Sequence, residues 1–234
     1  MNLILLESAD FVSEGRVQLF DRRLLHVRKV HRAQVGDRLV VGLLDGAIGE
    51  GVVTRLDASV LELSVTLNGA PPPRAPVLLL LALPRPKALR RILQHVSTLG
   101  VEEVVLLNAY RVEKSFWSSP ILSPASIDQA LRLGLEQARD TRRPRVRLCR
   151  RFKPFVEDEL PGLSAGRRRL LAHPYAGPCP RGVSEPLALA VGPEGGWIDY
   201  ERGLLASVGF EEVSLGNRIL RTESAISVLL GRLL

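Results

Sequence analysis

Hydrophobic residues in the first third of the chain recur at a spacing typical of short strands. Three runs, 38–42, 49–56 and 60–67, are rich in β-branched and other apolar residues. Turn-forming Gly, Asp and Ser residues separate these runs. The pattern predicts a small β-barrel.

The pattern changes after residues 69–76, where four prolines prevent a helix or a central strand from continuing, so we expect a domain boundary there. Beyond it, strand-like runs alternate with stretches at helical spacing. The expected strands are 77–83, 101–107, 170–172, 187–191 and 211–215, and the expected helices are 87–99, 123–139, 199–207 and 222–234. This alternation predicts an α/β fold with a mostly parallel sheet covered on both faces. The last helix is apolar over much of its circumference, which burial in the core or in a dimer interface would each explain.

Composition narrows the class of protein. The 234 residues are 46% hydrophobic, enough for a sizeable core. Their net charge of +7 attracts polyanions such as nucleic acid, although a general enrichment in arginine gives the same balance. Cys149 and Cys179 stand apart, without His or Cys at ligand spacing, so we expect neither a metal site nor a disulfide. The N-terminal apolar run is too short for a signal peptide or a membrane span, which indicates a soluble cytoplasmic protein.

Basic side chains crowd residues 16–32, with apolar residues between them. The cluster consists of Arg16, Arg22, Arg23, His26, Arg28, Lys29, His31 and Arg32. A solvated helix face and a surface that contacts phosphates both fit this pattern. The sequence leaves both interpretations open.

A glycine-rich loop follows the strand expected at 187–191. It reads Gly192-Pro193-Glu194-Gly195-Gly196-Trp197, and Asp199 is placed to cap the next helix. Glycines let the backbone approach an adenine or ribose closely, so we expect Gly195→Val to abolish ligand binding. The loop lacks the features of a Walker A or dinucleotide motif. A tight surface turn is the alternative.

A second loop, residues 216–222, also leaves a predicted strand and runs into a helix. Ile219 and Leu220 can form an apolar wall against a purine, and Arg221 can contact a phosphate or a developing anion. Thr222 can cap the helix. Because both loops leave strand ends, they predict a pocket for a nucleotide cofactor.

Together these loops resemble the signature of a known family. Gly192-Pro193-Glu194-Gly195-Gly196 and Leu215-Gly216-x-Arg218-Ile219-Leu220-Arg221-x-Glu223-x-Ala225 are similar to the motifs of the RsmE family, the 16S rRNA uridine-N3 methyltransferases of the SPOUT class. The resemblance extends over nearly the whole chain, through residues 26–30, 99–101 and 135–139. The chain departs from it at residues 95–98, where Lys-x-x-Glu is common, and at residues 110–112, where Glu-Arg-Ser is usual.

The resemblance implies a PUA-like, RNA-binding β-barrel in residues 1–70 and a SPOUT domain with a deep trefoil knot in residues 74–234. It also implies the cofactor S-adenosyl-L-methionine, a homodimer, and 16S rRNA, within the 30S subunit, as the substrate. Carried over by position, the cofactor contacts are Leu171, Ala172, His173, Gly192, Pro193, Glu194, Gly195, Gly196, Leu215, Gly216, Ile219 and Leu220.

Methylation of uridine N3 requires that the N3 proton leave. Arg221 can stabilise the uracil anion, Glu223 or a water can accept the proton, and Arg139 is a third catalytic candidate. Structural roles are equally open: a salt bridge or cap for Arg221 and Glu223, and an ion pair with Glu136 for Arg139.

The target base must also be unpaired, because N3 is buried in Watson-Crick pairing. Phe116 and Trp117 can stack on such a base or form a core aromatic pair. Arg111 and Lys114, from the same stretch, are candidates for RNA contact. Two other functions stay open: a SPOUT enzyme that acts on tRNA or 23S rRNA, and a ribosome-assembly factor without turnover.

Overall fold

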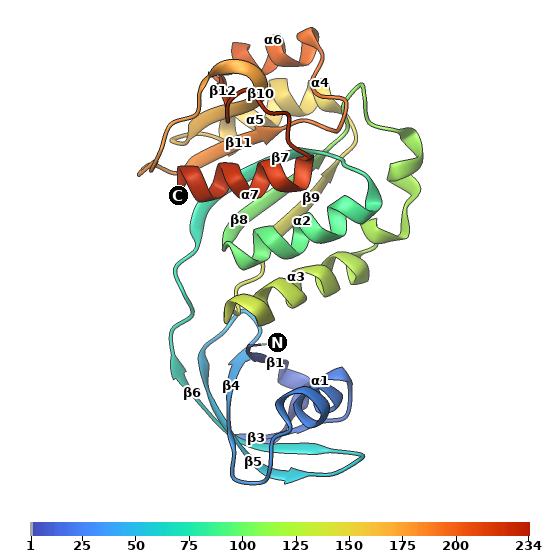
Figure 1. The fold of residues 1–234 in the computed structure, drawn as a ribbon, viewed down its shortest axis with the longest axis vertical. Helices are drawn as coiled ribbons and strands as arrows, with labels where there is room; N and C mark the ends of the chain where they lie inside the picture. The colour runs from blue at the N-terminus through green and yellow to red at the C-terminus, as the bar shows by residue number, and fades with distance from the viewer. Residues whose placement is uncertain (1) are drawn as a thin grey trace. The chain divides into compact units, whose positions relative to one another are not determined.

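The computed structural model describes residues 2–234, which form two compact units. The first unit holds the residues up to Pro73 together with Arg132–Arg143, and the second holds Arg74–Leu131 and Pro144–Leu234. Figure 1 shows the elements of each unit.

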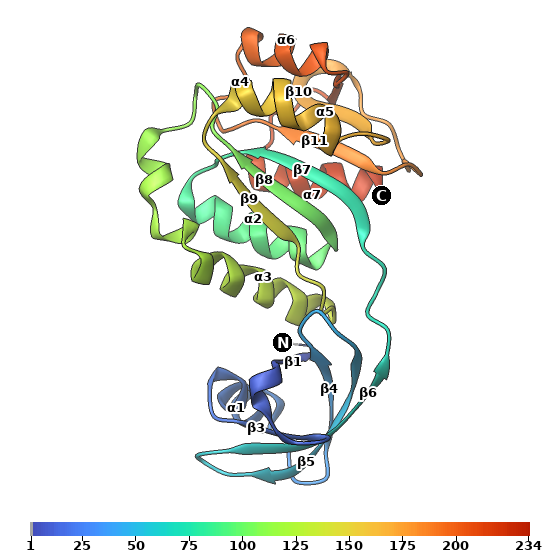
Figure 2. The same cartoon turned by 180° about the vertical axis from the view of Figure 1, so that it is seen from behind.

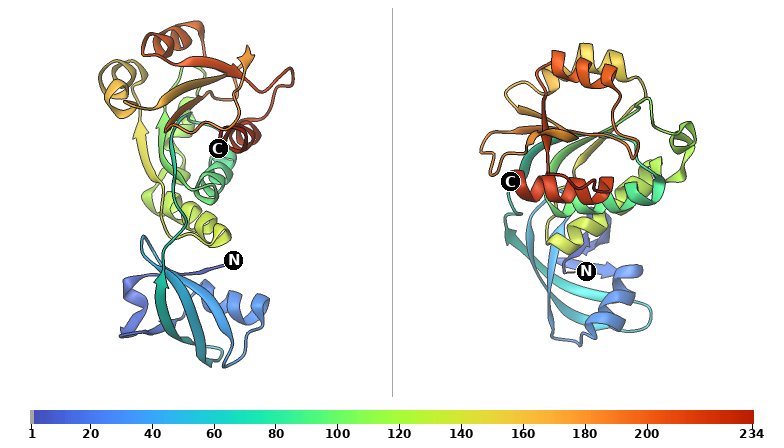
Figure 3. Two further views of the ribbon diagram at one scale, coloured as in Figure 1. Left: turned by 90° about the vertical axis from the view of Figure 1, so that its left-hand side faces the viewer. Right: turned by 45° about the horizontal axis from the view of Figure 1, so that its top comes forward.

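The first unit is built on a curled six-stranded sheet (Figure 3). Its strands are β1 (Ile4–Leu6), β2 (Phe11–Ser13), β3 (Arg16–Leu19), β4 (Arg38–Leu43), β5 (Ile48–Leu56) and β6 (Leu61–Gly69), in the order β1-β4-β5-β6-β3-β2. The pairing is antiparallel except between β1 and β4. The three expected strands are confirmed as β4, β5 and β6. The short strands β1, β2 and β3 were not expected, because each has only three or four residues.

The basic cluster begins on β3 and continues through two short helical segments, α1 (Arg22–His26) and a π-helical turn, η2 (Val27–His31). Leu24 and Val27 are buried in the core of this sheet, which explains why apolar residues alternate with basic ones there. The cluster therefore covers β3, which lies next to the end strand β2, and the two helical segments, and is not one continuous helix face.

Residues 132–143 pack with the first unit although the sequence places them beyond the linker. They include the last turns of α3 (Pro124–Ala138), where Leu135 is fully buried beside Leu3 and Leu5. The Glu136 carboxylate pairs with Arg22, and the Thr141 hydroxyl donates to the carbonyl of Gly46. These contacts join segments more than 90 residues apart, so no local pattern indicates them.

The second unit contains a six-stranded sheet in which all neighbouring strands are parallel, as expected. Its strands are β7 (Ala75–Ala82), β8 (Val101–Leu107), β9 (Arg145–Cys149), β10 (Arg168–Pro178), β11 (Leu187–Val191) and β12 (Glu211–Ser214), in the order β12-β10-β11-β7-β8-β9. Every residue of β11 is buried, which accounts for its continuous apolar run. The edge strand β9 was not expected, since it is half polar and mostly exposed.

Helices cover both faces of this sheet (Figures 1 and 2). On one face lie α2 (Pro86–Thr98) and α7 (Thr222–Leu233), which contact each other. On the other lie α4 (Phe152–Pro154), η5 (Phe155–Glu159), α5 (Leu160–Leu163) and α6 (Asp199–Ser207). Two 3-10 turns, η3 (Lys114–Ser118) and η4 (Pro120–Leu122), precede α3.

The apolar surface of α7 is mostly core. Ile226, Leu229, Leu230 and Leu233 are each at most 1% exposed, which confirms burial as one reason for its composition. Val228 remains 48% exposed, so a dimer interface on this helix stays a prediction.

Candidate active site

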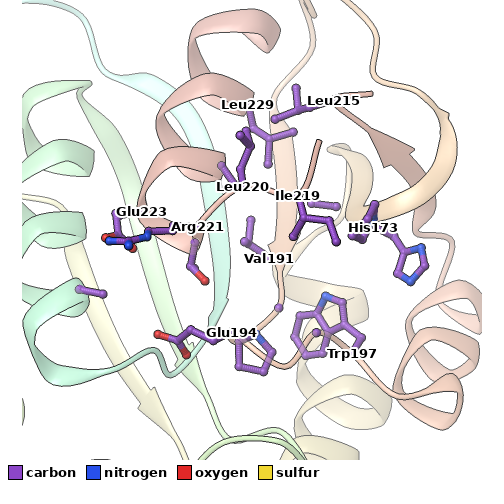
Figure 4. Close-up of a pocket in the computed structure, with 18 of the residues that line it drawn as sticks. His173, Val191, Glu194, Trp197, Leu215, Ile219, Leu220, Arg221, Glu223 and Leu229 are labelled. Carbon is purple, nitrogen blue, oxygen red and sulfur yellow. The ribbon is translucent and has the colours of Figure 1, made fainter. Parts of the chain in front are cut away.

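A cavity of about 820 Å³ lies at the carboxyl edge of the parallel sheet, within the second unit (Figure 4). Residues 172–174 of β10 and the loops after β11 and β12 form it, together with the start of α2 and the first turns of α7. It is lined by residues 172–174, 191–197, 213–216, 218–223, 225 and 229, and by Arg85, Lys87, Ala88 and Arg91. This position and size are typical of ligand sites in parallel α/β sheets.

The predicted cofactor residues converge on this cavity with one exception. Ala172, His173, the loop 192–196, and the four residues expected from the second loop all line it. Leu171 does not: it is 1% exposed and belongs to the hydrophobic core. Its side chain packs in that core instead.

The first loop is held by contacts from distant residues. Glu194 accepts a hydrogen bond from the backbone N–H of Arg85 at 3.0 Å, and the guanidinium of Arg111 donates to the carbonyl of Gly195. Gly196 has φ of +72°, a conformation that other residues rarely adopt. The loop is therefore a fixed element of the cavity wall, and a free surface turn does not describe it.

The expected steric reason for Gly195→Val needs correction. A Cβ at Gly195 would lie 3.0 Å from Cδ and 3.1 Å from Cβ of Arg111, so a side chain there would collide with that arginine. At Gly192, in contrast, a Cβ would lie 3.2 Å from the ring of Trp197, another residue of the cavity wall. A valine at 195 would thus act through displacement of Arg111.

Glu201 is a positioning residue that the sequence reading missed. Its side chain is 3% exposed, and its two carboxylate oxygens accept hydrogen bonds from the backbone N–H groups of Tyr110 at 2.7 Å and Ile198 at 3.1 Å. It therefore ties the loop after β8 to the first glycine loop. The expected cap, Asp199, is already the first residue of α6. A glutamate three residues into a helix, the spacing of a capping box, is the pattern that could have identified Glu201.

The second loop is shaped at its start by Ser214. Its hydroxyl donates to the carbonyl of Pro174 at 2.8 Å and accepts from the N–H of Gly216 at 3.1 Å. Gly216 has φ of +113°. Beyond it, Ile219 and Leu220 are 73% and 38% exposed although both are large and apolar, and both line the cavity. This exposure fits the predicted apolar wall for a ligand.

Arg221 and Glu223 both line the cavity, with different surroundings (Figure 4). Glu223 lies 3.7 Å from the guanidinium of Arg91, a long ion pair. Among the described residues, the guanidinium of Arg221 makes no hydrogen bond or ion pair. Arg221 occupies the N-cap position of α7 and Thr222, predicted to cap, is the first helical residue. Glu223 thus forms a salt bridge, as one of the alternatives expected, and Arg221 does not.

His173, which lines the cavity, lies beside an ion pair between Arg202 and Glu212. Arg202 donates two hydrogen bonds to Glu212, at 2.7 and 2.9 Å, and they hold the pKa of that carboxyl below its usual range. Nδ1 of His173 is 3.9 Å from the same carboxylate. Glu212 is therefore ionised at neutral pH and faces the imidazole.

Arg139 is not among the residues that line the cavity. It belongs to the first unit, where it is exposed and has a left-handed φ of +56° just after α3. The alternative ion pair with Glu136 is not formed either, because Arg22 occupies that carboxylate.

The predicted RNA-contact residues divide into two groups. Arg23 is 6% exposed and its guanidinium binds Asp10, Asp21 and the carbonyl of Leu5, so it is not placed to contact a polyanion. Arg16 and Arg22 pair with Glu62 and Glu136. Arg28, Lys29, Arg32, Arg111 and Lys114 are exposed, and His26 is half-buried with a pKa lowered mainly by burial.

The two aromatic residues proposed for base stacking belong to the core. Trp117 is 8% exposed, its Nε1 donates to Oδ1 of Asn108 at 2.9 Å, and Arg150 lies over its ring. Phe116 packs against the same core. The core alternative therefore holds for this pair.

Residues 2–234 contain no group of three or more His, Cys, Asp or Glu residues arranged to hold a metal ion. None of their helices is long and apolar enough to span a membrane.

The fold is shared with solved methyltransferases. The ribosomal RNA small subunit methyltransferase E of Neisseria gonorrhoeae, bound to S-adenosyl methionine, superposes with a TM-score of 0.76 at 20% identity, over 98% of this chain and 95% of that one. A probable rRNA-methyltransferase of Porphyromonas gingivalis gives 0.73 at 22% identity, over 97% and 95%. The chain thus has the α/β fold of these methyltransferases.

The sequence of the chain shows the family to which it belongs. Residues 71–234 match the RNA methyltransferase domain, and the chain belongs to this family. It is 29% identical to ribosomal RNA small subunit methyltransferase E of Treponema pallidum, over 96% of this chain and 87% of that protein. It is also 29% identical to the protein of the same name from Synechocystis, over 95% and 74%.

Proposed function

We propose that this protein transfers a methyl group from S-adenosyl-L-methionine to N3 of a uridine in 16S rRNA. The observation that carries the proposal is the cavity formed by the loops 192–197 and 215–221, which lies inside the part of the chain that matches the RNA methyltransferase domain. The relatives named as small subunit rRNA methyltransferases support the choice of substrate.

The residues of the cavity fit this cofactor. A Cβ built at Gly196 or Gly216 meets no atom within 4 Å, so both glycines leave space beside the backbone. Ile219 and Leu220 offer apolar surface to a purine, and the exposed backbone of the loops offers donors and acceptors. Charged groups for the amino-acid part are present in Glu194 and Arg218.

The proposed mechanism assigns separate tasks to two side chains. When bound, the cofactor supplies an electrophilic methyl group. Arg221, which has no carboxylate partner among the described residues, stabilises the uracil anion that forms as N3 loses its proton. Glu223, which lies 3.7 Å from the guanidinium of Arg91, accepts that proton directly or through a water.

The wider assembly is part of the same proposal. The first unit, with its exposed Arg28, Lys29 and Arg32, acts as a PUA-like RNA-binding barrel. The second unit carries the trefoil knot and pairs with a second copy of the chain as a homodimer. The substrate is the 30S subunit, which locates the protein in the cytoplasm.

The test is to incubate the protein with labelled S-adenosyl-L-methionine and small subunits that lack the modification, and to map the methylated nucleotide by mass spectrometry. We expect label at N3 of one uridine of 16S rRNA. Label in tRNA or 23S rRNA would select the second SPOUT function. Tight cofactor binding without transfer would select the assembly factor.

A further inference from the structure

The indole N–H of Trp197 is a buried donor without an acceptor. Trp197 is 4% exposed, and its Nε1 has no hydrogen-bond partner, a situation shared among the described residues only by Nε2 of His26. The other tryptophan, Trp117, donates from Nε1 to Asn108 at 2.9 Å. Buried polar groups are almost always paired, because an unpaired donor loses its bonds to water without compensation.

Packing alone does not account for an indole at this position. Its ring lies against Phe152, with 5.9 Å between the ring centroids, in the hydrophobic core. A phenylalanine would offer apolar surface there without leaving a donor unpaired. The N–H group therefore points to a function that the isolated protein does not use.

The donor lies beside the cavity. Trp197 lines it, and Figure 4 shows the indole nitrogen directed toward the space below Val191 and Ile219. A Cβ at Gly192 would come within 3.2 Å of Nε1, so the missing side chain at 192 leaves the backbone of the loop next to the donor. Nε1 is enclosed in the structure, so an acceptor reaches it only if the loop 192–197 moves from the position that Arg85 and Arg111 hold.

The surroundings indicate which part of a ligand would accept this hydrogen bond. Figure 4 shows Arg221, Glu223 and Glu194 on one side of the cavity, and Trp197 and Ile219 on the other. On the charged side, Glu194 suits the ionic amino-acid part of the cofactor, and Arg221 and Glu223 are assigned to the uracil. The apolar side suits the adenine and ribose, which carry neutral acceptors.

We propose that Trp197 is a cofactor-binding residue, whose indole N–H donates a hydrogen bond to the nucleoside part of the ligand. This inference rests on the proposed function for the identity of the ligand. Binding gives the buried N–H of Trp197 an acceptor. Trp197 therefore favours the loop conformation that holds the nucleoside.

Nuclear magnetic resonance tests this on the unaltered protein. The chain has two tryptophans, so its ¹H–¹⁵N spectrum contains two indole peaks, which Trp197→Phe and Trp117→Phe assign. Adenosine should move the Trp197 peak downfield and leave that of Trp117 nearly in place. A Trp197 peak that stays in place while adenosine binds would overturn the proposal.

Calorimetry provides the second readout. Trp197→Phe should weaken both S-adenosyl-L-methionine and adenosine by about three- to tenfold, the effect of one hydrogen bond, while Trp117→Phe changes neither. Unchanged affinity, or a loss confined to S-adenosyl-L-methionine, would refute a bond to the nucleoside. If the unaltered protein binds neither compound, the proposed function itself fails, which separates the two failures.

Discussion

At the scale of single residues, the wall of the cavity carries an arginine that pairs with no carboxylate of the described residues. Most arginines whose contacts are described here bind carboxylates or carbonyls, as Arg202 does with Glu212 and Arg23 with Asp10. Arg221 has no such partner among the described residues and stands at the cavity wall. A guanidinium that no carboxylate neutralises is available to an anion that forms only during the reaction.

Arg221→Ala should lower kcat by about 100-fold or more, because one electrostatic stabiliser of the anion is lost. Cofactor affinity should change by less than about threefold, since the fold and the glycine loops remain. Methyl transfer and calorimetry measure the two effects. The exposed Arg90→Ala on α2 is the matched control and should be unaffected. Equal kcat in the two variants would remove Arg221 from the mechanism.

Backbone conformation at the cavity makes a second prediction at this scale. Gly216 and Gly203 both have space for a Cβ, but only Gly216 has a positive φ, of +113°. Gly216→Ala should therefore lower the free energy of unfolding by about 1 kcal/mol or more and weaken cofactor binding. Gly203→Ala, within α6, should be neutral or stabilising by up to about 1 kcal/mol. Chemical denaturation compares the two, and equal losses would show that φ is not the cause.

At the scale of elements, α3 has the most consequential arrangement. Its residues up to Leu131 belong to the second unit, where the Ser97 hydroxyl donates to the carbonyl of Leu131. From Arg132 onward it packs with the first unit. There the carboxylate of Glu136 is 2% exposed and its partner Arg22 is 45% exposed. Such a carboxylate depends on its partner, because alone it would be a buried, uncompensated charge.

Arg22→Ala should consequently cost about 3 kcal/mol of stability or more. The control is Arg16→Ala, which removes an arginine 63% exposed and 3.6 Å from Glu62, and should cost less than about 1 kcal/mol. Thermal unfolding of the two variants, each compared with the unaltered protein, checks the difference. Similar losses in the two variants would mean that the Glu136 pair contributes no more than a surface ion pair.

At the scale of the whole molecule, the exposed basic cluster and the cavity belong to different units. The cavity is formed entirely by residues of the second unit. The exposed part of the basic cluster, Arg28, Lys29 and Arg32, belongs to the first. RNA affinity and cofactor affinity should therefore respond to different substitutions.

Replacing Arg28, Lys29 and Arg32 together by Gln should weaken RNA binding and reduce the slope of log K against log salt by about two to three. Cofactor affinity should stay the same. The control is Arg38→Gln, whose guanidinium already pairs with Glu50 at 2.7 Å in the same unit. An unchanged slope in the triple variant would mean that this cluster is a solvated surface.

Elements set by local pattern could be predicted from the sequence. Continuous apolar runs mark the buried strands β7 and β11 and the second half of β8, and glycine placement marks the two loops of the cavity. These features depend on neighbours a few residues apart, so the order of residues alone carries them. The short or exposed strands, such as β9, lack that pattern.

Contacts between distant segments were decided only by the tertiary structure. The burial of Arg23, the pairing of Glu136 with Arg22, and the link that Glu201 makes to Tyr110 join residues that no spacing connects. The same is true of Trp197, whose neighbours leave its N–H unpaired. The sequence by itself thus determined the longer and more apolar strands and the two loops of the cavity, because hydrophobic periodicity and turn formation are local. Which side chains are available for chemistry was determined by packing, because burial and pairing depend on the whole fold.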